Sequence, residues 1–357
     1  MGPSGPTERG AQGAGRRVLV TGLSTFWGGR VAQALEADPS VDVIIGLDTE
    51  EPTVELERTE YVRADQSYSI LSRLVRATRV DTILHTFLTV DSTGSSGRAL
   101  REANVIGTMN LLAAAGAPDS SVRNLVVKSS TLVYGASHRD PAWFREDMAR
   151  TSLARTGLER SLLEVEDYLS DFADDNPHVT VSLLRFANVL GPDIRTPLSR
   201  LLDLPVVPAI AGFDPLLQFV EEHDVVRAIL HVMNEEIPGI FNVAGDGRLP
   251  WSECASLCGR RTAGILPPFG TERLLAPFER LTELPAEVLS LLRFGRGVDN
   301  SRLTSTGFAY SCTSAGAVDA YAKAARLRRT IGPAPGYRWE RDVETFFRTS
   351  SAVVHDS

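Results

Sequence analysis

The sequence predicts an α/β fold in which helices cover both faces of a parallel sheet and a smaller lobe is added toward the C-terminus. An apolar run at Val18–Val20, typical of a buried strand, leads through a glycine turn into a helical pattern at residues 31–35. Short β-branched runs then alternate with helical patterns as far as Gly191, which indicates parallel strands joined by right-handed crossovers. Beyond Gly191 the alternation weakens and prolines interrupt residues 192–215. Together these observations predict a Rossmann-type doubly wound sheet with an interleaved C-terminal lobe.

The first turn has the form of a phosphate-binding loop, because a strand, a glycine turn and a helix direct backbone N–H groups toward a phosphate. Gly22 permits the tight turn, and Gly28 lets the helix pack closely on the strand. Thr25 stands where the pattern T-G-x-x-G-x-x-G has its middle glycine, which normally lets a pyrophosphate approach the backbone. With Trp27, these residues are candidates for binding a dinucleotide, although a glycine turn is often only a connection.

The second strand, residues 41–48, ends in Asp48. An acid near this distance from the glycine turn hydrogen-bonds the adenosine ribose in dinucleotide-binding folds, although it could also merely cap a loop. Because a carboxylate repels a 2′-phosphate, Asp48 favours NAD over NADP as the cofactor.

The rest of the chain extends the alternation. Further strands are expected at 61–65, 80–85, 125–130, 179–184 and 239–243, and helices at 67–77, 97–116, 153–171 and 224–233. Beyond Trp251 the chain reads as mainly helical, with loops at 267–268 and 295–297. The pattern predicts a disordered tail at 1–16, an NAD-binding domain at 17–191 with a returning segment at about 218–247, a substrate lobe at 192–217 and 248–349, and a loose tail at 350–357.

Composition argues against several classes of protein. The net charge of −8 gives no general case for binding nucleic acid, and no apolar run is long enough to span a membrane. Residues 1–16 lack the apolar core of a secretory signal. The three cysteines suit a reducing cytoplasm, and although Cys254 and Cys258 could share a helix face, no further ligand completes a metal site. We therefore expect a cytoplasmic protein without a bound metal.

Several further motifs are specific in their order and spacing. They are Ala64-Asp65, His85-Thr86-Phe87, Asn104 in Asn-Val-Ile-Gly-Thr, the segment from Ser129-Ser130 to Tyr134-Gly135, the run 184–192 with Asn188, Gln218-Phe219-Val220 and Phe241–Gly245. Through them nearly the whole chain after the tail resembles the extended short-chain dehydrogenase/reductase family, the NAD-dependent nucleotide-sugar epimerases and dehydratases. It looks most similar to actinobacterial UDP-glucose 4-epimerase-like proteins.

The resemblance implies roles for individual residues. Asp65 would contact the adenine, and His85, Thr86 and Asn104 would complete the cofactor site. The resemblance further implies that Ser130 holds the substrate hydroxyl, exchanging a hydrogen bond with the oxygen that gains or loses a proton during hydride transfer.

The family also implies a ligand and a partner. Asn188 and Gln218 would bind a nucleotide-sugar or a similar small molecule. A homodimer would pair the helices at 97–116 and 153–171 with their copies. An apolar stripe on the second helix could supply that contact or could be ordinary core: Leu158, Leu162, Val165 and Tyr168.

The chain departs from the family at the catalytic base, a Tyr followed four residues later by a Lys. Counting back from Glu164, the family's acidic residue further along the helix, places Thr156 at the Tyr position and Arg160 at the Lys position. Arg160 would keep a positive charge and could bind the nicotinamide ribose. The Thr156 hydroxyl titrates far above a phenol, so it could relay a proton but could hardly hold an oxyanion.

Lys128 is unusual because it adds a lysine where the family pattern does not require one, in a chain whose only other lysine is Lys323. It lies two residues before Ser130 on a central strand, hence on the same face. A lysine in such a buried place is costly unless it is paired or functional. It could act in catalysis or bind the ribose, or its ammonium could reach a carboxylate at the end of the sheet.

Two functions therefore stay open. The first is an NAD-dependent enzyme acting on a nucleotide-sugar or a related carbonyl/alcohol pair, similar to a UDP-sugar 4-epimerase; the family's dehydratases carry an Asp-Glu pair where this chain has Thr131-Leu132. The second is a non-catalytic NAD-binding sensor or scaffold that has lost the Tyr base. Ser130 and Asn188 favour the first function, and the absent Tyr favours the second.

Overall fold

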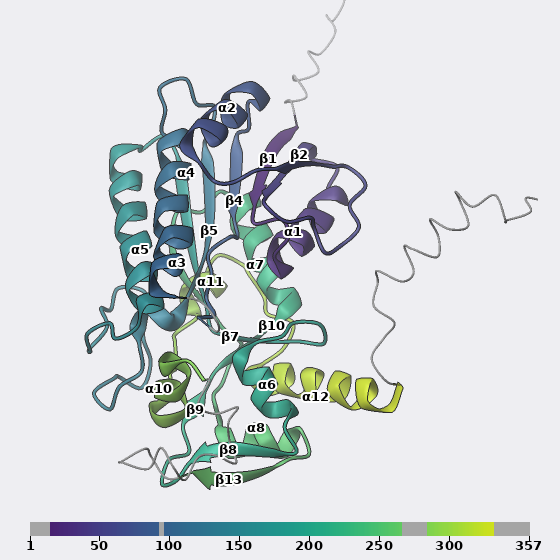
Figure 1. Ribbon diagram of the computed structural model, residues 1–357, viewed down its shortest axis with the longest axis vertical. Helices are drawn as coiled ribbons and strands as arrows, with labels where there is room; N and C mark the ends of the chain where they lie inside the picture. The colour runs from purple at the N-terminus through teal and green to yellow at the C-terminus, as the bar shows by residue number, and fades with distance from the viewer. Residues whose placement is uncertain (1–14, 93–95, 266–283, 332–357) are drawn as a thin grey trace, which may run out of the picture.

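The central feature of the computed structural model is a parallel sheet of seven strands in the order β11-β6-β5-β4-β1-β2-β3 (Figure 1). Its strands are β1 (Arg16–Thr21), β2 (Val41–Asp48), β3 (Thr59–Arg63), β4 (Thr82–His85), β5 (Asn124–Ser130), β6 (Thr180–Phe186) and β11 (Gly239–Val243). Every neighbouring pair is parallel. The doubly wound Rossmann-type fold is thereby confirmed. The strand order reverses between β1 and β4, the switch point beyond which ligands bind in such sheets.

The structure describes residues 15–92, 96–265 and 284–331. Most of the expected N-terminal tail, the loop at 267–268 and the C-terminal tail at 350–357 lie outside these ranges. No helix within them has both the length and the apolarity that a membrane crossing requires.

Helices cover the two faces of the sheet separately (Figure 1). One face packs against α1 (Phe26–Glu36) and α7 (Glu222–Glu235), and the other against α2 (Tyr68–Thr78), α4 (Gly107–Ala115) and α5 (Gly157–Asp175). Alternate residues of one strand serve the two cores: Val18 and Val20 face the first, and Leu19 faces the second. This alternation is why the strands are apolar on both sides.

Two predicted helices differ in detail. The helix expected at 97–116 is divided into α3 (Gly97–Arg101), a π-helical turn (Glu102–Ile106) and α4. The turn contains Asn104, whose side-chain amide is bonded to both backbone polar atoms of Thr89. The helix expected at 153–171 begins only at Gly157, because Thr156 and Glu159 form a capping box there.

The C-terminal lobe lies beyond the carboxyl ends of the strands (Figure 1). Its helices are α6 (Pro197–Asp203), α8 (Trp251–Leu257), α10 (Ala286–Phe294) and α12 (Ser314–Ile331), whereas α11 (Ser301–Thr304) packs against β11 and adds Leu303 to the core of the sheet. Its short strands are paired as β7 (Asn188–Leu190) with β10 (Phe219–Glu221), β8 (Val206–Ile210) with β13 (Arg261–Ile265), and β9 (Leu216–Leu217) with β12 (Leu249–Pro250). The segment after Trp251 is therefore less uniformly helical than expected. Trp251 and Tyr321 anchor the lobe's core and donate hydrogen bonds to Pro208 O and Ser199 O, at 2.9 and 2.7 Å.

The stripe considered for dimerisation belongs to the interior of the single chain. Leu158, Leu162 and Val165 are fully buried, and the half-buried Tyr168 packs against the same core as Val165. The outward face of α5 instead presents exposed acids, among them Asp167 and Asp171. The homodimer thus stays a prediction, without the apolar stripe that was considered for it.

A buried ion pair joins α5 to strand β6 of the sheet. The guanidinium of Arg185, on β6, donates to both carboxylate oxygens of Glu166, with a shortest distance of 2.6 Å. It also donates to the Tyr134 hydroxyl at 2.7 Å, and Ser129 on β5 donates to Glu166 at 2.8 Å. Glu166 and Arg185 are both less than a tenth exposed. The network therefore holds the end of β5, where Ser130 follows.

We expect Glu166→Gln to lower the free energy of unfolding by about 3–5 kcal/mol, because it leaves the Arg185 guanidinium buried without its counter-charge. Urea denaturation measures this. The matched control is Asp167→Asn, which neutralises an exposed acid on the same helix and should change stability by less than about 0.5 kcal/mol. Equal effects of the two changes would contradict a structural role for the pair.

Candidate functional site

The turn between β1 and α1 is held by close backbone packing. Gly22 has φ of +78°, and a Cβ placed on it would lie 2.7 Å from Phe87 Cα. A Cβ on Gly28 would lie 2.0 Å from Gly22 O. Side chains at these positions would push the turn from the sheet edge, so both glycines are required for this geometry.

Thr25 folds back into the turn and caps α1. Its hydroxyl donates to Gly22 O at 2.6 Å and accepts from Gly28 N at 3.0 Å. The next two N–H groups, of Phe26 and Trp27, are the first of the helix and so have no carbonyl partner within it. Both residues line the cavity described below. The helix N-terminus thus offers free donors to a pyrophosphate.

Asp48 connects the end of β2 to the same turn. Its carboxylate accepts hydrogen bonds from the backbone N and hydroxyl of Ser24, at 2.9 and 2.7 Å, and from Thr49 N at 2.7 Å. It borders an open groove that also contains Asp65 and Gln66. Gln66 Oε1 is buried and accepts no hydrogen bond from the described residues. This oxygen is enclosed against α4, where a Cβ on Gly107 would lie 2.6 Å from it.

His85 lies behind the turn rather than on its open side. It is fully buried, and its Nδ1 and Nε2 are 2.6 and 3.0 Å from the hydroxyls of Thr21 and Thr108. Thr108 donates its own proton to Asn104 O, so Nε2 carries the ring proton and Nδ1 accepts from Thr21. Burial, with a smaller contribution from Lys128, lowers the pKa of His85 to about 3. His85 is neutral, and both ring nitrogens are used within the protein.

Thr86 and Asn104 likewise position the backbone. Thr86 donates to Thr21 O at 2.9 Å. The Asn104 amide accepts from Thr89 N at 2.8 Å and donates to Thr89 O and to Ser161 Oγ, at 3.0 and 3.2 Å. Neither residue, nor His85, lines the cavity or the groove. All three instead fix the segment after β4, which borders both.

A cavity of about 280 Å³ lies between the carboxyl edge of the sheet and the C-terminal lobe. Thr25, Trp27, Lys128, Ser130 and Asn188, five of the residues predicted for the site, meet there. The wall is completed by residues 186–189 and 194–198, by one side of α10, and by Val90, Asp91, Leu132, Val225 and Arg296. The structure therefore joins the glycine turn, the end of β5 and the lobe in one space.

Ser130 and Lys128 come from the same strand. Ser130 is half-buried at the end of β5, and its Oγ accepts from Leu132 N at 3.2 Å, which leaves the hydroxyl proton free to be donated. Lys128 is 5% exposed and donates from Nζ to Leu88 O at 3.1 Å. Burial lowers the pKa of Lys128 to about 8.

The positions expected to replace the Tyr and Lys lie elsewhere. Thr156 caps α5, accepting from Glu159 N at 3.1 Å. Arg160 is exposed and donates to the carbonyls of Ala154 and Arg155, at 3.4 and 3.2 Å. Neither residue lines the cavity. The two side chains serve the start of the helix, because a threonine is too short to reach inward and the arginine turns back along the chain.

Of the two residues predicted to bind substrate, one lines the cavity and the other does not. Asn188 lines the cavity; its Nδ2 donates to Gln218 O at 2.9 Å, and its Oδ1 accepts no hydrogen bond from the residues described. Gln218 is 2% exposed, donates to Gly245 O and accepts from Val298 N, so both ends of its amide are used inside the protein. Gln218 supports β10 and lies off the cavity.

Sequence reasoning missed Arg296, which the lobe contributes to the cavity wall. Its side chain is buried, donates to Gly135 O at 2.8 Å, and makes no ion pair within the part of the chain that is described. Burial, only partly opposed by Glu159 and Asp140, lowers the pKa of Arg296 to about 10. The sequence does place Arg296 between Gly295 and Gly297 in an expected loop. Because these two glycines have no side chains, the loop can approach the cavity closely, and this pattern could have indicated Arg296 as a site residue.

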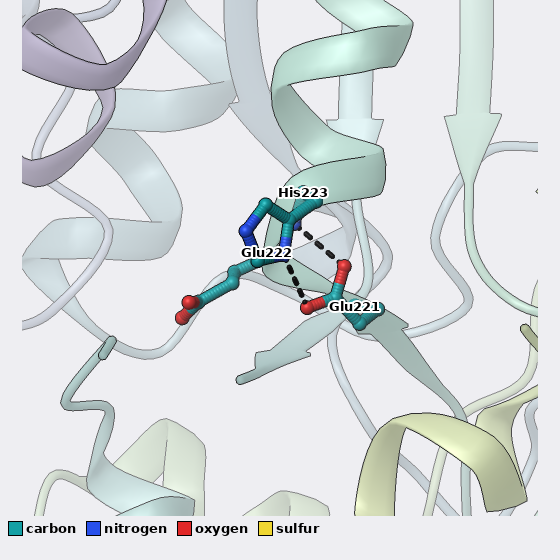
Figure 2. A group of neighbouring side chains, drawn as sticks. All are labelled: Glu221, Glu222 and His223. Carbon is teal, nitrogen blue, oxygen red and sulfur yellow. Dashed lines mark hydrogen bonds and ion pairs between the residues drawn. The ribbon is translucent and has the colours of Figure 1, made fainter. Parts of the chain in front are cut away.

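A group of possible metal ligands starts α7. Ligand atoms of Glu221, Glu222 and His223 lie within 4.8 Å of one another (Figure 2). Glu221 accepts from His223 N at 2.7 Å and pairs with its Nδ1 at 2.8 Å, which raises the pKa of His223. The Glu222 side chain extends away from this pair (Figure 2). Its carboxylate accepts from Asp193 N and Ile194 N. These contacts make the group a helix cap that holds the loop before α6.

Comparison with known proteins agrees with this geometry. A model of the NAD dependent epimerase/dehydratase family matches residues 18–244. An uncharacterized protein of Mycobacterium tuberculosis (strain H37Rv) is 34% identical over 332 residues, covering 90% of this chain and 88% of that protein. An uncharacterized protein of Mycobacterium bovis is similar to the same extent.

Solved structures share the fold. UDP-glucose 4-epimerase of Thermotoga maritima, solved with UDP-glucose, has a TM-score of 0.66 at 18% identity, covering 88% of this chain and 99% of that one. UDP-glucuronic acid 4-epimerase of Bacillus cereus, solved with NAD, has a TM-score of 0.67 at 17% identity, covering 89% and 99%. The dTDP-glucose 4,6-dehydratase of Bacillus anthracis has a TM-score of 0.66 at 15% identity, covering 88% and 98%. The extent of the family match and of the mycobacterial relatives shows that the chain belongs to the NAD-dependent epimerase/dehydratase family, with NAD as its cofactor.

Proposed function

We propose that the protein is an NAD-dependent enzyme that acts on a nucleotide-sugar or a related alcohol/carbonyl pair, in the manner of a UDP-sugar 4-epimerase. The observation that carries this proposal is the single cavity in which Ser130, Asn188 and Arg296 meet the N-terminal residues of α1. A cofactor held by the turn and a substrate held by the lobe would share that space. Between them stands the Ser130 hydroxyl, the donor that the family resemblance assigns to the substrate oxygen.

The cofactor would lie along the carboxyl edge of the sheet. The N–H groups of Phe26 and Trp27 would bind the pyrophosphate, and Asp48 the adenosine ribose. Asp65 and Gln66 border the groove on the adenine side. When bound, NAD accepts a hydride from the substrate carbon and can return it.

Two arginines support an anionic substrate. Arg296 is a buried guanidinium without a carboxylate partner among the described residues, and Arg195 lines the same cavity. Arginine matches phosphate oxygens geometrically and would offset the cost of burying its charge by binding a diphosphate. Two of the similar structures are named as UDP-sugar epimerases, which agrees with this substrate class.

The alternative is a protein that binds NAD without catalysis. It is favoured by Thr156 and Arg160, which lie off the cavity, so that the family's Tyr–Lys pair has no equivalent on α5. A cytoplasmic location and a homodimer remain predictions under either function.

The first test separates enzyme from binder. Purified protein should bind NAD in calorimetry, show a thermal shift with UDP-glucose, and convert UDP-glucose to its 4-epimer. Ser130→Ala should lower turnover by about 100-fold or more and leave NAD affinity unchanged, because the hydroxyl would donate to the substrate oxygen and not to the cofactor. Ser121→Ala, at a serine far from the cavity, is the control. NAD binding with no turnover of any UDP- or dTDP-sugar would favour the alternative.

The second test concerns cofactor choice. The natural protein should bind NAD at least about tenfold more tightly than NADP, a difference of about 1.4 kcal/mol. Asp48→Asn keeps an acceptor for Ser24 but removes the charge that repels a 2′-phosphate, so calorimetry should find the preference reduced. Glu50→Gln, which neutralises an exposed acid two residues further on, should leave it unchanged. Tighter binding of NADP by the natural protein would reject the role of Asp48.

The third test concerns the substrate. Arg296→Met should weaken UDP-glucose binding to the NAD-loaded protein by about tenfold or more, the loss expected for a buried charge-assisted contact. NAD affinity should not change, since Arg296 lies on the lobe. Arg139→Met, at an exposed arginine, is the control. Unchanged UDP-glucose affinity in Arg296→Met would argue against a diphosphate at this guanidinium.

A further inference from the structure

The proposed function leaves one group without a source: the acid–base side chain that exchanges a proton with the substrate oxygen. In the described chain, the family's Tyr position is a helix cap and its Lys position is an exposed arginine. Such a group has to reach the cavity beside Ser130. Lys128 does so, because residues two apart on a strand point to the same face and both line the cavity.

Lys128 is buried without a counter-charge. Its one hydrogen bond to the described chain goes to a neutral acceptor, Leu88 O at 3.1 Å, and no carboxylate oxygen of the described residues lies within 4.0 Å of its Nζ. Burying an ammonium without a counter-charge costs free energy. Burial therefore favours the neutral amine of Lys128, which can accept a proton.

The charged groups around the cavity are engaged elsewhere or carry positive charge. Asp91 accepts from Arg200 at 2.9 Å, and Glu287 accepts from the Ser92 hydroxyl. Arg195 and Arg296 line the same cavity, and the neutral His85 comes from the neighbouring strand β4. None of these neutralises the Lys128 ammonium. The pKa of about 8 at Lys128 agrees with this setting, so that amine and ammonium forms interchange near physiological pH.

We propose that Lys128, carried by β5, is the acid–base residue of this site and replaces the Tyr that relatives carry on the helix. The inference rests on the proposed function. During oxidation the substrate O–H bond breaks and its proton passes to the lone pair of the neutral Lys128 Nζ, while the C–H bond gives its hydrogen and both electrons to NAD. During reduction the hydride returns to the carbonyl carbon and the Nζ proton returns to the oxygen. Ser130 Oγ donates to the same oxygen throughout and so orients it toward the lysine.

The two-lysine composition makes a direct test possible without turnover. Protein labelled with ¹³C at lysine Cε should give two lysine signals, from Lys128 and Lys323, and Lys323→Arg assigns them. Lys323 is exposed and pairs with Asp319 at 2.6 Å, so it serves as the internal reference. We expect the Lys128 signal to titrate near pH 8, against about 10.4 for a free lysine, and to shift on saturation with NAD while the Lys323 signal does not. A Lys128 signal that titrates like a free lysine, or that does not respond to bound NAD, would overturn the proposal.

The second test of the proposal measures the rate of turnover. With UDP-glucose as substrate, kcat/KM should rise with pH through the Lys128 titration, because the free enzyme must hold the neutral amine to accept a proton. Lys128→Arg keeps a positive charge that cannot titrate; it should retain NAD binding, lose about 100-fold or more in kcat, and lose the pH dependence. Lys128→Met should lose turnover equally, and Lys323→Met should behave as the natural protein.

The outcomes separate the two claims. If the natural protein does not bind NAD, the proposed function fails. If it binds NAD and epimerises UDP-glucose, and Lys128→Arg keeps full turnover with the natural pH profile, the proposed function stands and the role of Lys128 is rejected. If NAD binds and no sugar turns over, the NMR titration alone decides whether Lys128 is a neutral-range base facing the cofactor.

Discussion

The site depends on the close approach of the turn after β1 to the segment after β4. At Gly22 and Gly28 the backbone contacts leave no space for a Cβ. This packing holds the first N–H groups of α1 at the carboxyl edge of the sheet. Asp48 reinforces it from the neighbouring strand by accepting two hydrogen bonds from Ser24. The pyrophosphate site is therefore built from backbone, and Thr25 takes the middle glycine position without opening the turn because its hydroxyl bonds back into it.

Polar groups buried on the far side of the turn determine where the cavity wall lies. Each hydrogen bond of the series Thr21–His85–Thr108–Asn104 is made inside the protein, and the series holds the segment after β4 in place. Burial in hydrogen-bonded pairs is what makes such groups tolerable inside a core. The Arg185–Glu166 pair does the same for the end of β5.

The placement of positive charge is where the chain is expected to differ from the pattern that the family resemblance implies. The resemblance implies a lysine on the helix that follows β5, and this chain has a buried lysine on β5 itself, lining the cavity. Nearly all other basic residues of the chain are arginines. A buried lysine can lose its proton near neutral pH, whereas a guanidinium stays protonated. Thr156 caps α5, and the exposed Arg160 donates to the backbone that precedes that helix.

The sequence by itself determined the elements whose signals are local. The alternation of strands and helices, the glycine turn, Asp48 at a strand end, and Lys128 and Ser130 on one face follow from residue periodicity and backbone preferences, and they appear as expected. The tertiary structure decided what depends on residues distant in the chain. It interrupted the helix at 97–116 around Asn104, turned Gln218 and His85 inward, made core of the stripe on α5, and brought Arg296 to the cavity from a loop more than 160 residues after Ser130. The physical reason is that burial and hydrogen-bond partners come from the packing of separate elements, and no pattern within one segment records which of its side chains that packing will satisfy.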